Sequence, residues 1–110
     1  MKHLVTRTDL DALFAAEQAL VFKNSRTCPI SAAARRQVAA LIGRHPDLQI
    51  FVVDVHSGAP LSREIERRTG IVHHSPQVIV LACGAPRWHA SHFDITARDV
   101  ERALEPEESV

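Results

Sequence analysis

Two continuous apolar runs, residues 19–22 and 50–53, constrain the fold of this chain most. Unbroken runs of this length are typical of strands that are buried on both faces of a parallel sheet. Between them, Pro29 is placed to open a helix that runs to about residue 42 and is ended by Gly43. Its apolar stripe consists of Ile30, Ala34, Val38 and Leu41. Residues 19–53 therefore predict a strand–helix–strand unit.

The flanking segments extend this alternation. A first helix is predicted from a Thr8 cap to about Gln18, and a short one over residues 60–69, which Gly70 ends. Residues 77–83 and 87–93 predict an antiparallel hairpin, and Thr96 with Asp99 predicts the cap of a last helix that reaches about residue 104. This order is the thioredoxin topology. We expect an α/β fold with a four-stranded mixed sheet, helices on both faces and an extra N-terminal helix.

Length and charge restrict the domain organisation and the partners. The 110 residues predict a single domain over 1–110, with an acidic tail at 105–110. Thirteen basic and thirteen acidic residues balance and are intermixed, which argues against a nucleic-acid partner. No apolar run approaches the roughly 18 residues of a membrane span, and no signal-peptide core follows Met1. We expect a cytoplasmic protein with no membrane partner.

The motif Thr27-Cys28-Pro29-Ile30-Ser31 carries the candidate chemistry. It puts Cys28 at the N-terminus of the predicted helix, where unpaired backbone N–H groups and the helix dipole favour a thiolate over a thiol. Cys28 is thus predicted to be the attacking nucleophile of thiol–disulfide exchange, a reaction that needs no metal or organic cofactor. The alternative is a packing cysteine, since cysteine is among the residues most often buried.

A proline directly before a predicted central strand needs a special reason, because it removes a ladder donor. In the predicted topology that reason is a cis peptide bond between Ser75 and Pro76. Such a bond would bring residue 75 beside the sulfur of Cys28, with its backbone groups free to pair with an extended substrate.

Three segments, residues 22–31, 69–77 and 91–96, together resemble the monothiol bacilliredoxins, which are thioredoxin-like proteins of bacillithiol-using bacteria. The resemblance spans roughly residues 4–104. It implies the removal of bacillithiol from protein mixed disulfides, with Cys28 attacking and Pro76 as the cis-proline. Bacillithiol would be a co-substrate, and the partners would be S-bacillithiolated proteins and a low-molecular-weight thiol. The predicted substrate contacts are Thr27, Pro29, Ile30, Ser31, Ser75 and Pro76.

Ser31 occupies the place where dithiol relatives carry a resolving cysteine. It can donate a hydrogen bond to the Cys28 thiolate but cannot resolve a mixed disulfide, so a thiol from outside must finish the reaction. Cys83, which departs from the family pattern, is predicted to be a buried packing residue at the far end of the hairpin. Lys23 and Arg26 lie close enough in sequence to add positive charge near Cys28, but we expect both to be solvated.

Histidine and tryptophan residues offer weaker signals. The pairs His73–His74 and His89–His92 would point to opposite faces if extended, so no metal site is expected. His74 and His92 are the better candidates for contacting the substrate or tuning Cys28, against a general expectation of solvated histidine. Trp88 is expected to pack on a sheet face.

Two other function classes stay open. Single-cysteine proteins of this topology can hold an iron–sulfur cluster between Cys28 and an external thiol across a dimer, although Pro29 leaves less room than a small residue would. The chain could also be a thioredoxin-like interaction module without turnover. Absorbance of freshly purified protein would reveal an iron–sulfur cluster. The reactivity of Cys28 would distinguish an active thiol from that of an interaction module without turnover.

Overall fold

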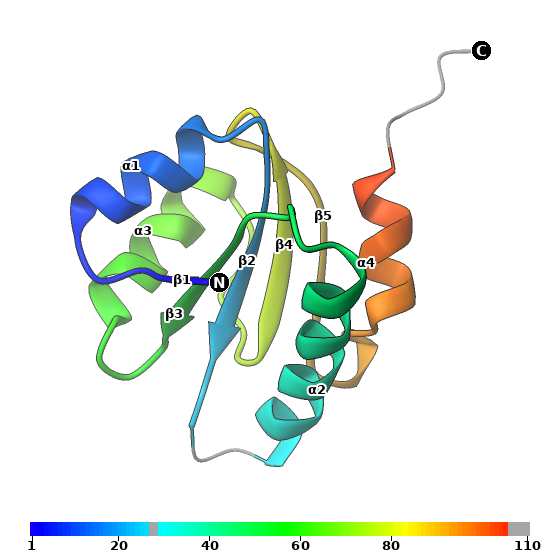
Figure 1. Ribbon diagram of the computed structural model, residues 1–110. Coiled ribbons are helices and arrows are strands. Elements are labelled where there is room, and N and C mark those ends of the chain that lie inside the picture. Colours follow the sequence, from blue (N-terminus) through cyan, green and yellow to red (C-terminus); the bar gives the residue numbers. More distant parts are fainter. Residues whose placement is uncertain (27–28, 106–110) are drawn as a thin grey trace.

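The computed structural model describes residues 1–26 and 29–105, and its core is a five-stranded mixed sheet (Figure 1). The strands are β1 (Lys2–His3), β2 (Gln18–Asn24), β3 (Ile50–Asp54), β4 (Gln77–Ala82) and β5 (Ala85–Ser91). The helices are α1 (Arg7–Ala15), α2 (Pro29–Arg44), α3 (Ala59–Thr69) and α4 (Ala97–Leu104), with a short 3₁₀ helix η1 (His92–Asp94). The expected α/β class and the order of its principal elements are confirmed.

The sheet has the order β1-β3-β2-β4-β5. β2 runs parallel to β3 and antiparallel to β4, and β4 pairs antiparallel with β5. The prediction of four strands was wrong by one, because Lys2 and His3 pair with Phe51 and Val52 at the edge of β3. Both side chains of this two-residue strand are exposed, so β1 carries no apolar pattern that a sequence reading could detect.

Helices cover both faces of the sheet, with α1 and α3 on one side and α2 and α4 on the other (Figure 1). Ala19 and Val21 of β2 pack with Leu10, Leu13 and Ile65 on the first side. Leu20 and Phe22 pack with residues of α2 and α4 on the second, where Trp88 packs as expected. Residues 19–22 and 50–53 are all buried, which confirms that these runs form strands covered on both faces.

Several helix boundaries differ from the predictions. Thr6 rather than Thr8 caps α1, in a capping box in which the Thr6 hydroxyl accepts from the Asp9 backbone N–H and the Asp9 carboxylate accepts from the Thr6 backbone N–H. The helix ends at Ala15, so Gln18 opens β2 instead of ending α1. Gly43 lies inside α2, which continues to Arg44.

Other boundaries hold. Gly70 ends α3 in the left-handed conformation at φ 73°, and Thr96 caps α4 by accepting from the Asp99 backbone N–H.

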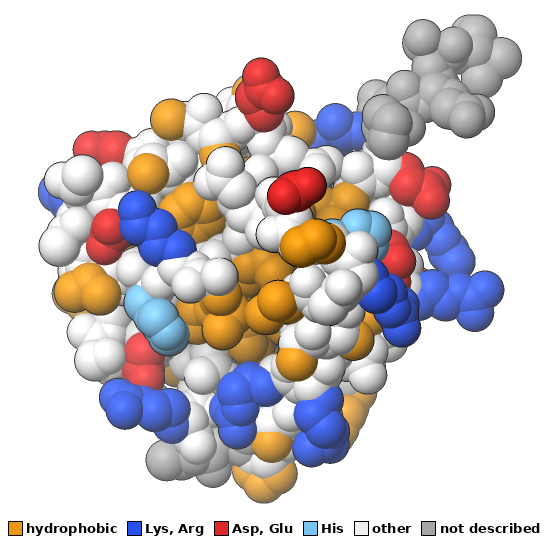
Figure 2. Space-filling view, in the orientation of Figure 1, with side chains coloured by type: hydrophobic (Ala, Val, Ile, Leu, Met, Phe, Trp, Pro, Cys, Tyr) orange, Lys and Arg blue, Asp and Glu red, His pale blue; other side chains and the backbone are white. Residues whose placement is uncertain are grey.

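On the face shown in Figure 2, acidic and basic side chains are interspersed around a central group of apolar side chains. None of the helices within residues 1–26 and 29–105 combines the length and apolar character that a membrane crossing needs.

The β4–β5 turn corrects the prediction for Cys83. β4 ends at Ala82, and Cys83 and Gly84 form the turn with positive φ angles of 50° and 79°. Cys83 is exposed, not buried, and it lies in the turn after the last residue of β4 instead of in the covered strand. Its backbone N–H donates to the carbonyl of Glu17, which ties the turn to the start of β2.

Candidate active site

The candidate site lies at the end of the sheet where β2 leads toward α2 and where β4 begins, which we call the junction end. Lys23 of β2 is opposite Gln77, the first residue of β4, and Gln77 directly follows Pro76. α2 begins at Pro29, as expected. Thr27 and Cys28 lie outside the described residues. The roles predicted for these two residues therefore rest on the sequence and on the described residues on either side of them.

The start of α2 is tied to the end of β2. Ser31 is fully buried, and its hydroxyl accepts a hydrogen bond from the backbone N–H of Ser25 at 3.3 Å. Arg35 donates to the Asn24 side-chain oxygen at 3.0 Å and to the Ser25 carbonyl at 3.2 Å. Pro29 is exposed and Ile30 half-buried. Of the predicted substrate contacts at the start of α2, Pro29 is thus exposed to solvent and Ser31 is buried.

Arg26 forms an ion pair with Asp54 at the end of β3, with 2.7 Å between its Nε and Oδ2. The Asp54 carboxylate also accepts from the backbone N–H groups of His56 and Ser57. These two hydrogen bonds, followed by the contact with Arg26, hold the pKa of Asp54 below its ordinary value. Arg26 remains largely exposed, so its charge is available at the junction end.

Lys23 overturns the expectation that it is solvated. The residue is fully buried, because β2 alternates and Lys23 follows Ala19 and Val21 onto the face that α3 covers. Its Nζ lies 3.1 Å from Nδ1 of His73. Burial lowers the pKa of Lys23 to about 8, although the charge of Glu66 works in the opposite direction. The sequence analysis overlooked the position of Lys23 in its strand, because Lys23 continues the alternation of Ala19 and Val21 on the buried face.

His73 connects three parts of the junction end. Its backbone N–H donates to the Glu66 carboxylate of α3, and its Nδ1 lies 3.3 Å from the hydroxyl of Ser62 in the same helix. Burial lowers the pKa of His73, and the charges of Lys23 and His74 add to this effect while Glu66 opposes it. The sequence analysis did not single out this residue from the other histidines.

The bond between Ser75 and Pro76 is cis, as the sequence analysis expected. The Pro76 carbonyl accepts from the backbone N–H of His92 at 3.0 Å, and Gln77 donates to the Val72 carbonyl at 3.0 Å. The Ser75 hydroxyl and the Gln77 side-chain oxygen are buried without a hydrogen-bond partner. Unpartnered polar atoms of this kind are uncommon in protein interiors, so these two mark the segment before β4 as a candidate functional element.

An open groove of about 470 Å³ lies beside this segment. It is lined by His74, His89, Ala90, Ser91, His92, Phe93 and Asp94. The rings of His74 and His92 stack with their centroids 5.4 Å apart, and Nδ1 of His74 lies 2.9 Å from the Ser91 hydroxyl. The two histidines that the sequence analysis preferred are therefore together, next to Pro76. Within the described ranges, no group of three or more His, Cys, Asp or Glu side chains is arranged to hold a metal ion.

A comparison with known families identifies the chain. The sequence model of the family described as monothiol bacilliredoxin BrxC matches residues 2–100. This chain belongs to that family. The match covers the three segments that carried the resemblance in the sequence, and it includes the Cys28 motif and the Ser75–Pro76 pair.

Solved structures place the bacilliredoxin chain in the thioredoxin fold. A structure described as a candidate oxidoreductase with a thioredoxin fold is similar at a TM-score of 0.88 and 28% identity, over 94% of this chain and 93% of the other. Thioredoxin from Fasciola hepatica matches at a TM-score of 0.75 and 18% identity, over 94% and 96% of the two chains. Mitochondrial thioredoxin 3 from Saccharomyces cerevisiae matches at 0.76 and 15%, over 94% and 92%. Family and fold together support a thiol oxidoreductase.

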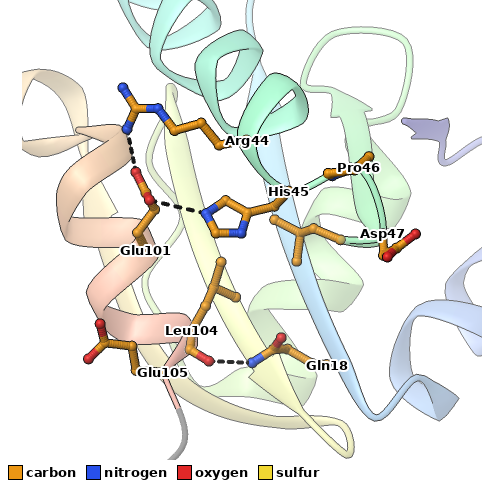
Figure 3. Close-up of a pocket in the computed structure, with 9 residues that line it drawn as sticks. Gln18, Arg44, His45, Pro46, Asp47, Glu101, Leu104 and Glu105 are labelled. Carbon is orange, nitrogen blue, oxygen red and sulfur yellow. Dashed lines mark hydrogen bonds and ion pairs between the residues drawn. The ribbon is translucent and has the colours of Figure 1, made fainter.

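A second hollow in this bacilliredoxin lies at the opposite end of β2 and belongs to the packing of α4. In Figure 3, Arg44 and His45 at the end of α2 point toward Glu101 of α4, and both contact its carboxylate. Gln18 donates to the Leu104 carbonyl at 2.8 Å. These contacts join α2, β2 and α4, and they are separated from the junction end by the length of the strand.

Proposed function

We propose that this protein is a monothiol thiol–disulfide oxidoreductase that removes bacillithiol from protein mixed disulfides, with Cys28 as the attacking thiolate. The observation that carries the proposal is the family match over residues 2–100, which includes Cys28 directly before α2. The thioredoxin fold supports it, because that fold supplies a strand-to-helix junction beside a cis-proline. The reducing cytoplasm is the proposed compartment.

The proposed reaction is a pair of exchanges without net oxidation of the enzyme. The Cys28 thiolate attacks the bacillithiol sulfur of the mixed disulfide, a new disulfide forms, and the protein thiolate leaves and takes a proton from solvent. A second low-molecular-weight thiol then attacks as its thiolate, so that its disulfide with bacillithiol departs and the Cys28 thiolate is restored. No metal or organic cofactor is needed, and bacillithiol serves as co-substrate.

The positions of Ser31 and Cys83 support the need for an external thiol. Ser31 carries no sulfur, and its hydroxyl accepts a hydrogen bond from the Ser25 N–H. Cys83 follows Ala82, which is paired with Gln18 at the other end of β2 from Lys23. Neither residue is therefore placed to resolve a mixed disulfide on Cys28 within the same chain.

The proposed substrate contacts divide by exposure. Thr27 and Cys28 lie outside the described residues, Pro29 is exposed, and Ile30 and Ser75 are half-buried. Ser31 and Pro76 are buried, so we assign them to shaping the site through the backbone segments that they hold. The partners are S-bacillithiolated proteins, which would first contact the exposed Pro29 and the half-buried Ser75.

The test is transfer of bacillithiol from a labelled protein substrate to this protein, followed by intact mass and peptide mapping. We expect an adduct on Cys28 and release of the substrate thiol. Cys28→Ser should give no release, and Cys83→Ser is the matched control that should keep it. The same substrate carrying glutathione tests the preference for bacillithiol. Transfer to Cys83, or release by Cys28→Ser at the normal rate, would contradict the proposal.

A further inference from the structure

The segment of residues 71–76 carries the Ser75–Pro76 bond and is attached to the rest of the fold at several points, one of which is His73. The backbone N–H of His73 donates to Glu66 of α3, while its Nδ1 faces Nζ of Lys23 at 3.1 Å and the hydroxyl of Ser62 at 3.3 Å. One histidine thus joins the segment to both β2 and α3. Whatever changes the hydrogen bonding of His73 changes the attachment of this segment.

The hydrogen bond with Lys23 determines which ring nitrogen of His73 carries the proton. An ammonium group has three donors and no acceptor, so a protonated Lys23 requires a bare Nδ1 on its partner. His73 must then be neutral, with its proton on Nε2. Lys23 has no carboxylate within ion-pair distance among the described residues, so His73 is its principal acceptor there.

We propose that Lys23 and His73 are positioning residues, whose part-buried hydrogen bond holds the 71–76 segment in its substrate-binding arrangement only while His73 is neutral. This inference rests on the proposed function, because it takes the Ser75–Pro76 segment as a contact for the mixed disulfide. Neither side chain needs to touch the substrate. Their effect is on how well the segment is placed before the substrate arrives.

Protonation of His73 breaks the hydrogen bond between its Nδ1 and Lys23. It would put an N–H on Nδ1 opposite the Lys23 ammonium, so that two positive charges face each other at the present 3.1 Å. The other groups that act on His73 are Glu66 and Ser62 of α3 and His74 of the same segment, and of these the Glu66 carboxylate favours protonation. Burial and Lys23 nevertheless lower the pKa of His73. The Lys23–His73 hydrogen bond is therefore intact at neutral pH and is lost as the pH falls through that lowered pKa.

The first test is Lys23→Met, which keeps a long side chain and removes the charge. With a bacillithiolated protein as substrate at neutral pH, we expect KM to rise about tenfold and kcat to stay within about twofold, as for the loss of one part-buried charged hydrogen bond. The chain has only two lysines, and Lys2→Met is the matched control because Lys2 is exposed. An unchanged KM in Lys23→Met would overturn the inference.

The second test is His73→Asn, which retains an acceptor near the position of Nδ1 but cannot be protonated. We expect its KM to be within about threefold of the original protein at neutral pH and to stay flat toward acid, where the original protein's KM rises. His73→Leu, which has no acceptor, should match Lys23→Met. Equal acid dependence in His73→Asn and the original protein would contradict the proposal.

A spectroscopic readout stays valid even where a variant fails to fold. Nitrogen NMR of the imidazoles in the original protein should show His73 as the Nε2–H tautomer with a pKa below 6.5. Finding the Nδ1–H tautomer at neutral pH would overturn the inference. Failure of the proposed function gives a different pattern, namely no bacillithiol adduct on Cys28 in the original protein, whatever the state of His73.

Discussion

The hydroxyl of Ser31 accepts a hydrogen bond from the backbone N–H of Ser25 at 3.3 Å. Ser31 belongs to the first turn of α2, and Ser25 comes directly after β2. The bond therefore joins the end of β2 to the first turn of α2, the two elements that come before and after Cys28 in the sequence. Both residues are buried, so neither the donor nor the acceptor has water as a ready substitute.

Ser31→Ala is expected to destabilise the fold. It leaves the buried Ser25 N–H without its acceptor, which costs about 1–3 kcal/mol of unfolding free energy. Attack by Cys28 should persist in a single turnover, because Ser31 contributes no sulfur. Urea denaturation measures the stability, with Ser57→Ala at an exposed position as the control. Equal stability of Ser31→Ala and the original protein would show that the bond contributes nothing.

The two cysteines are expected not to form a disulfide within one folded chain. The register pairs Gln77 with Lys23 and Ala82 with Gln18, so the far end of β2 is about 17 Å along the strand from Lys23 and Cys83 lies beyond it. A disulfide needs Cα atoms within roughly 7 Å. Mild oxidation of the monomer followed by peptide mapping should show no Cys28–Cys83 link. Because Cys83 is exposed, iodoacetamide should label it without denaturant.

Stability should depend on pH through Lys23. Its pKa is 10.5 in the unfolded chain and about 8 in the fold, so between these values the unfolded chain binds more protons. Unfolding free energy then rises with pH across that window. Below it, the full cost of burying the ammonium applies. The original protein should therefore gain stability relative to Lys23→Met between about pH 8 and 10.5, by at most a few kcal/mol. Urea titrations of both proteins across this range check the sign.

Asp54 is expected to protect the turn after β3. Its carboxylate accepts from the backbone N–H groups of His56 and Ser57, so Asp54→Ala should speed hydrogen exchange at those two amides. Arg26→Ala is the matched variant, since it removes the ion pair and leaves in place both hydrogen bonds from the His56 and Ser57 amides to Asp54. Equal acceleration in the two variants would mean that the ion pair, and not the carboxylate cap, orders this turn.

The start of α1 shows why some boundaries could not be predicted. Thr6 precedes Asp9 by three residues, and Thr8 precedes Asp11 by three residues, so the sequence contains the same capping pattern twice. The structure uses the first, and Lys2 and His3 pair with β3 just before it. A local pattern contains no information about where the preceding residues attach to the sheet.

At the candidate site, the sequence pointed to Ser75–Pro76 and to the pair His74 and His92, and the structure brings these residues together. The sequence-based predictions of burial were wrong for Lys23, which is buried, and for Cys83, which is exposed. Lysine is usually at the surface and cysteine usually inside, but burial here follows position in the sheet. Lys23 lies on the covered face of β2, near the end of the strand, whereas Cys83 lies in a turn.

The sequence by itself determined the order of the elements, the two strands buried on both faces and the place of the cysteine motif before α2. Those features depend on residues one to four positions apart, which periodicity and capping record directly. Only the tertiary structure decided that Lys23 meets His73, fifty positions further along the chain. That contact requires the register of β2 against β4 and the packing of α3 on the sheet, which arise from long-range burial and leave no local pattern in the sequence.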